Sequence, residues 1–109
     1  MKTVAVREAG APIFAALGDE VRLRIVTKLS SAGPQSITRL TAGQRVTRQA
    51  IAKHLGVLAG TGLVANERRG RQQIYQLRSA PLDDARRCLD ILAKQWDAAL
   101  ARLAAFVEE

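Results

Sequence analysis

Two side chains that can recognise DNA bases stand next to each other in the segment VTRQAIAKHLGVLAGTGLV, residues 46–64. The Arg48 guanidinium presents paired donors that match guanine, and the Gln49 amide presents a donor and an acceptor that match adenine. Both precede an apolar helical pattern, in which Ile51, Leu55 and Leu58 recur on one side. That apolar side needs neither residue, so the polar side is either ordinary solvated surface or a surface that reads DNA.

The distribution of charge favours a surface that reads DNA. The chain has a formal net charge of +7, and residues 22–78 contain eleven basic residues but only one acidic residue, Glu67. A purely solubilising surface usually mixes both signs, whereas a block of one sign is typical of a protein that binds a polyanion. Thirteen of the seventeen basic residues are arginine, which suits bidentate contacts with phosphate and guanine.

The size and composition of the chain predict one small folded domain. With 109 residues, 48% of them apolar, the chain can bury a modest core. The single cysteine, Cys88, excludes an intramolecular disulfide and is typical of a reducing compartment. The first residues, MKTVAVREAGAPIF, lack the continuous apolar core of a signal peptide, and no apolar run approaches the roughly 20 residues of a membrane span. We therefore expect a soluble, cytoplasmic protein with no membrane partner.

Capping residues and apolar spacing divide residues 1–62 into four helices. Asp19, Ser36 and Thr47 are expected N-caps, because each can accept a hydrogen bond from a free backbone N–H group of the first turn. The expected helices are a short one over residues 9–17, a second that begins after Asp19 and breaks at residues 30–34, a short third after Ser36, and a fourth after Thr47 that ends near Gly60 and Gly62. Val46 and Ile51 have the spacing of a hydrophobic staple on the fourth helix.

The segment that follows predicts a basic two-stranded ribbon. Residues 63–68 and 72–77 are strand-like and flank a tight turn, Arg69-Gly70-Arg71. Helix, short helix, turn, helix and basic ribbon are the parts of a winged helix-turn-helix, a mainly α fold with a two-stranded β wing. We assign residues 1–109 to a single domain of this kind. Residues 1–80 form the DNA-binding core, with the wing at about 63–78, and residues 81–109 form a C-terminal dimerisation helix.

The helix after Thr47 is the expected recognition helix, whose first residues meet base edges in the major groove. Arg48 and Gln49 are predicted to contact bases. Contacts with the phosphate backbone, or for the wing with the minor groove, are predicted for Arg45, Thr47, Lys53, His54, Arg68, Arg69 and Arg71. His54 has an alternative role, since it could instead fill the edge of the helix pair.

The last segment carries an apolar seam with heptad spacing. Pro81 suits the first turn of a helix, and apolar residues then recur at alternating intervals of three and four. The seam consists of Leu82, Ala85, Leu89, Leu92, Trp96, Ala99, Leu103 and Phe106. A monomer could fold this helix over its own core, but pairing with a twofold mate is the better use of so long a seam. We expect a homodimer, with Cys88 as a small apolar residue at or near the interface rather than a redox switch.

Three segments resemble the ArsR-type winged-helix repressors. ALGDEVRLRIVTKL is similar to that family's entry into its second helix, VTRQAIAKHLGVLAGTGLV to its recognition helix, and RRGRQQIYQL to its wing. The resemblance covers roughly residues 12–78, with a compatible last helix. It implies a homodimer formed through the first and last helices and bound to an inverted-repeat operator in a promoter.

The chain departs from the metal-sensing members of that family. The stretch QSITRLT lacks their cysteine pair, and the last helix has Asp83, Asp84, Asp90 and Asp97 but no histidine. Arg45 stands where the family's turn usually carries glycine. These features resemble a metal-independent branch, so we expect no metal site and no cofactor.

The resulting expectation is a sequence-specific, double-stranded DNA-binding transcriptional regulator. Repression is favoured over activation, because a compact dimer with no evident extra domain can occlude a promoter. An enzyme is not expected, because the one histidine and the one cysteine fall on separate elements. A winged-helix protein-interaction adaptor and a non-specific polyanion binder are the alternatives. No residue pattern marks a pocket for an inducer.

Overall fold

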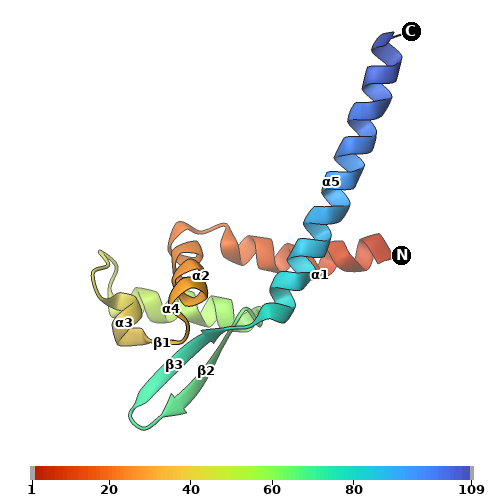
Figure 1. Cartoon of the computed structure of the whole chain (residues 1–109). Coiled ribbons are helices and arrows are strands. Elements are labelled where there is room, and N and C mark those ends of the chain that lie inside the picture. Colours follow the sequence, from red (N-terminus) through yellow and green to blue (C-terminus); the bar gives the residue numbers. More distant parts are fainter. Residues whose placement is uncertain (1, 109) are drawn as a thin grey trace.

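The computed structural model describes residues 2–108, with side chains from Glu8 onward, and shows a mainly helical chain with one small sheet (Figure 1). The elements in chain order are α1 (Lys2–Leu17), α2 (Glu20–Ala32), β1 (Gln35–Ser36), α3 (Ile37–Thr41), α4 (Arg48–Gly60), β2 (Val64–Arg69), β3 (Gln72–Leu77) and α5 (Ser79–Glu108). This order confirms the predicted winged helix-turn-helix fold class. Among these helices, none is both long and apolar enough to cross a membrane.

Three side chains act as N-caps for helices of the DNA-binding core, as the sequence predicts. Asp19 accepts a hydrogen bond from the Arg22 N–H at 3.0 Å, Ser36 from the Arg39 N–H at 3.2 Å, and Thr47 from the Ala50 N–H at 3.1 Å. Each bond satisfies one of the backbone donors that a helix start leaves unpaired. The start of α4 is therefore set by Thr47.

The inner side of α4 anchors this helix in the core. Ile51, Leu55 and Leu58 are at most 1% exposed, and Val46 packs against the same core just before the cap. The cluster also contains residues of α1, α2, α3, β2 and α5, together with Leu63 just before β2. They are Ile13, Ala16, Ile25, Val26, Leu29, Leu40, Leu63, Val64 and Ala85. Because the inner side is fully buried, the opposite side of α4 is held at the surface in one orientation.

The sheet has three antiparallel strands in the order β1-β3-β2. β2 and β3 form the predicted wing, paired from Val64↔Leu77 to Arg69↔Gln72, with Gly70 at a φ of +62° in the turn. β1 was not expected, since two residues are too short for a periodic signal. It pairs with Tyr75 and Ile74 of β3 and so ties the start of α3 to the wing.

The α1 and α5 helices pack together near one end of α5. α1 begins at Lys2, earlier than the predicted start at residue 9. The two helices are close at Gly10, where an added Cβ atom would lie 3.1 Å from the Cys88 Cβ atom. Cys88 is buried there, 7% exposed. The second half of α5, dark blue in Figure 1, extends away from every other element.

This packing places the first two positions of the predicted dimer seam against the chain's own core. Ala85 is 5% exposed and belongs to the chain's own core, and Leu82 packs against the same core. These two positions therefore pack within the chain, because the beginning of α5 is covered by its neighbours and the rest is not. The large apolar side chains that stay exposed on α5 are Leu89, Leu92, Trp96, Leu100, Leu103, Phe106 and Val107. Ala99 lies half-buried on the same face, and Leu100 and Val107 widen that face beyond the predicted heptad positions.

Candidate nucleic-acid interface

The beginning of α4 presents polar side chains to solvent. Gln49, Ala52 and Lys53 are exposed on the helix side away from the buried residues, and Arg48 is exposed at the first position of the helix. The small Ala52 between the longer side chains leaves the helix axis free to approach another surface closely. The structure thus leaves Arg48, Gln49 and Lys53 accessible, as the sequence predicts.

Arg48 has a contact that the sequence did not indicate. Its Nη1 atom donates to the Thr38 Oγ1 atom at 3.1 Å, which links the first residue of α4 to α3. The two residues are ten positions apart, and the contact depends on the angle between α3 and α4. A helical pattern within either segment could not reveal it.

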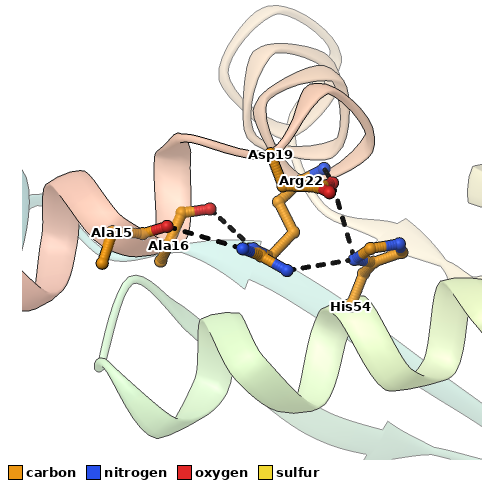
Figure 2. Close-up of polar contacts among 5 residues, drawn as sticks. All are labelled: Ala15, Ala16, Asp19, Arg22 and His54. Carbon is orange, nitrogen blue, oxygen red and sulfur yellow. Dashed lines mark hydrogen bonds and ion pairs between the residues drawn. The ribbon is translucent and has the colours of Figure 1, made fainter.

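His54 points toward α2. Its side chain is 21% exposed, and its Nδ1 atom lies 3.4 Å from Arg22 Nη1 and 3.7 Å from Asp19 Oδ2 (Figure 2). His54 is three residues after Ile51 and four before Leu58, so helical geometry puts it at the edge of the buried side. This position agrees with the alternative role, at the edge of the helix pair, and the phosphate contact stays a prediction.

Arg22 is a residue that sequence reasoning missed. Its Nε atom donates to the Ala16 carbonyl at 2.6 Å and its Nη2 atom to the Ala15 carbonyl at 3.4 Å (Figure 2). Carbonyls in the last turn of a helix lack intrahelical partners, so Arg22 satisfies two groups at the end of α1. With His54, it joins α1, α2 and α4 in one polar junction. An arginine three residues after a capping aspartate is the local signal that could have indicated it.

Asp19 supports this junction from the start of α2. The backbone N–H of Arg22 holds the pKa of the Asp19 carboxyl below its usual value of 3.8, against an opposing effect of desolvation. The nearby His54 ring and Arg22 guanidinium act in the same direction as the backbone donor. Asp19 is therefore ionised at neutral pH, as a helix cap and as a neighbour of the Arg22 guanidinium and the His54 ring.

The wing carries its arginines at an exposed tip. Arg68, Arg69 and Arg71 are all exposed around the turn at Gly70. Arg68 Nε donates to the Gly70 carbonyl at 3.2 Å, and Arg69 Nε lies 3.4 Å from Glu67 Oε1. An exposed pair of this kind is weak, so it leaves Arg69 available to another anion.

Arg45 lies exposed in the connection between α3 and α4. The positive φ that this turn needs is supplied by Gly43, at +73°, two residues before Arg45. Gln44 is fixed by Arg24, whose Nη1 atom donates to Gln44 Oε1 at 3.1 Å. Arginine at position 45 is therefore compatible with an ordered turn, and it adds a cation beside the start of α4.

Side chains that could hold a metal ion are not gathered anywhere in the described part of the chain. No three His, Cys, Asp or Glu residues form a suitable group there. His54 is engaged with α2, and Cys88 lies between α1 and α5.

Comparisons with known proteins relate this architecture to transcriptional regulators. A helix-turn-helix domain family matches residues 17–67. The HTH-type transcriptional regulator YuzN of Bacillus subtilis (strain 168) is 40% identical over 76 residues, which cover 64% of this chain and 83% of that protein. The HTH-type transcriptional regulator Rv2034 of Mycobacterium tuberculosis is 33% identical, over 85% of this chain and 83% of that protein.

A solved structure extends the similarity to nearly the whole chain. The ArsR-like transcriptional regulator from Rhodococcus sp. RHA1 superposes with a TM-score of 0.78 at 37% identity, covering 94% of this chain and 95% of that one. Another solved structure, the homodimeric winged helix-turn-helix domain Mb0332 from Mycobacterium bovis, has a TM-score of 0.62 at 22% identity, a likeness of fold.

Proposed function

Since the chain belongs to the ArsR-type family of winged-helix transcriptional regulators, we propose that it is a homodimeric repressor that binds an inverted-repeat operator in a promoter. The chain is a DNA-binding regulator and not an enzyme. The observation that carries the proposal is the exposed start of α4. There Arg48 and Gln49 are exposed in the first turn of a helix whose buried residues anchor it in the core.

Base recognition is assigned to the first turn of α4. Arg48 bonds guanine and Gln49 bonds adenine, each through two hydrogen bonds in the major groove. Thr47, Lys53 and Arg45 surround this turn and contact the phosphate backbone, which positions α4 without selecting a sequence. The exposed arginines of the wing, Arg68, Arg69 and Arg71, contact the backbone or the adjacent minor groove.

Dimerisation is assigned to the exposed apolar face of α5. The large side chains from Leu89 to Val107 are between 47% and 76% exposed in the isolated chain. An apolar face of this length on one helix is typical of a helix that pairs with a second copy. A twofold dimer presents two α4 helices to two half-sites, which is why we propose an operator with inverted-repeat symmetry. Such a dimer represses by covering the promoter, without any metal ligand.

The test is binding to a fragment of the chain's own promoter and to a scrambled fragment, measured across a series of salt concentrations. Arg48→Ala or Gln49→Ala should cost about 1–3 kcal/mol at the operator and relax the preference at particular base pairs. Arg69→Ala or Arg71→Ala should weaken both fragments equally and reduce the salt dependence by about one unit per lost phosphate contact.

The matched control is Arg102→Ala, which removes the same charge from an exposed position on the far half of α5. It should leave the preference for the operator over the scrambled fragment unchanged. If Arg48→Ala weakens both fragments by the same factor, α4 binds only the backbone and the proposed base recognition is wrong. If the unaltered protein binds both fragments equally, the proposed operator function is wrong.

A further inference from the structure

The hydrogen bond between Arg48 and Thr38 joins the two helices of the helix-turn-helix in the free protein. The donor is Nη1 of Arg48, the first residue of α4, and the acceptor is Oγ1 of Thr38, on α3, at 3.1 Å. Both residues are exposed, so this bond holds a long, flexible side chain in a place where solvent would otherwise leave it mobile. The contact restricts the position of the guanidinium before any ligand arrives.

Among the hydroxyl residues of α3 and its cap, Thr38 is the one whose side chain bonds to α4. Ser36 caps α3 by accepting from the Arg39 N–H at 3.2 Å, and Thr41 donates to the Ile37 carbonyl at 2.7 Å. Those two hydroxyls form hydrogen bonds with backbone groups of α3. The Thr38 hydroxyl instead receives a charged donor from the neighbouring helix, and a β-branched side chain offers that acceptor in few rotamers.

The nitrogen atom that bonds to Thr38 determines which donors of Arg48 stay free to bind a base. A guanidinium has five N–H donors in a rigid plane, and one edge pairs Nε with Nη2. The bond to Thr38 engages Nη1, which is outside that edge. The Nε–Nη2 edge therefore keeps both donors for an acceptor pair, and O6 and N7 of guanine form such a pair.

We propose that Thr38 is a positioning residue for base recognition, which holds Arg48 so that its Nε–Nη2 edge meets guanine. The proposal rests on the proposed role of Arg48. A side chain fixed in its binding geometry loses less conformational freedom on binding than a mobile one. Thr38 thus contributes to specificity without touching a base.

The experiment compares Thr38→Val, which keeps the shape but removes the acceptor, with Thr38→Ser, which keeps the hydroxyl. The Arg48→Ala variant first identifies the base pair that Arg48 reads, by binding to operators that each carry one substitution. Thr38→Val should then lower the preference for guanine over adenine at that pair by about threefold to tenfold, the range expected for one hydrogen bond. Thr38→Ser should restore the preference, and Thr38→Val should have no effect in the Arg48→Ala background.

Thr27→Val is the matched control, because Thr27 is an exposed α2 residue whose hydroxyl donates to the Leu23 carbonyl of its own helix, at 2.8 Å. It should leave base preference unchanged. Equal loss of affinity for every DNA with Thr38→Val, or the same effect without Arg48, would overturn the proposal. If Arg48→Ala changes base preference and Thr38→Val does not, only the positioning role is wrong. If Arg48→Ala leaves base preference unchanged, the proposed reading by Arg48 and this inference both fail.

Discussion

Replacing Leu92 with aspartate should dissociate the homodimer that we propose, because Leu92 lies on the exposed apolar face of α5, between Leu89 and Trp96. Its side chain is 53% exposed in the isolated chain, and Leu89 and Trp96 on the same face are 54% and 65% exposed. A partner helix would cover this surface. The substitution places a carboxylate there in both copies.

The size of the effect follows from the exposed fraction of Leu92. Full burial of a leucine side chain is worth about 1.5–3 kcal/mol, so covering the exposed half is worth about 1 kcal/mol in each copy. The two copies together lose about 2 kcal/mol of apolar contact. Burying a carboxylate without a partner adds several kcal/mol more. A total of at least about 4 kcal/mol weakens dimerisation by roughly a thousandfold.

Sedimentation or light scattering over a range of micromolar concentrations measures this change as the mass of the particle. Ala101→Asp is the control, since it adds the same charge to an exposed position on the opposite side of α5. The control should remain a dimer, and Leu92→Asp should be a folded monomer with an unchanged helix content. A dimer that is equally stable with Leu92→Asp, or an unaltered chain that is monomeric at these concentrations, would refute the assignment of the interface.

Three further outcomes are expected. Leu58→Ala should lower the free energy of unfolding by about 2–5 kcal/mol in a denaturant titration, because Leu58 is fully buried, and a loss below about 1 kcal/mol would contradict the core that holds α4. Because the pKa of Asp19 is lowered in the folded chain, its ionised form stabilises the fold above pH 3.8, and this contribution disappears as the pH falls through the lower folded value. The stability difference between the unaltered chain and Asp19→Asn should therefore be present at pH 7 and vanish in acid, and a difference that is independent of pH would be evidence against the role of the charge. Adding zinc or a chelator should leave operator affinity unchanged, since the sequence lacks the cysteine pair of metal-sensing relatives, and a tenfold change would contradict this expectation.

Local interactions made much of the DNA-binding core predictable from the sequence. Asp19, Ser36 and Thr47 cap their helices through bonds that span three residues, so the residue types are sufficient to locate each start. The buried side of α4 and the exposure of Gln49 and Lys53 on its other side follow from a period of 3.6 residues. The wing follows from two strand-like runs around a glycine turn.

Contacts between distant segments were decided by the tertiary structure alone. The crossing of α1 and α5 turned Ala85 inward and left the later apolar positions of α5 exposed, although all of them share one heptad pattern. The pairing of β1 with β3 has no periodic signal in a two-residue strand.

Contacts between distant segments also decided the arrangement of the candidate interface. The sequence placed Arg48 and His54 on one helix, but the position of α2 drew His54 into a junction with Arg22, and the position of α3 supplied Thr38 to Arg48. Residue type and spacing determine which groups a helix offers. Which of those groups meets another helix depends on how the packed core sets the angles between elements, and only the folded chain contains that information.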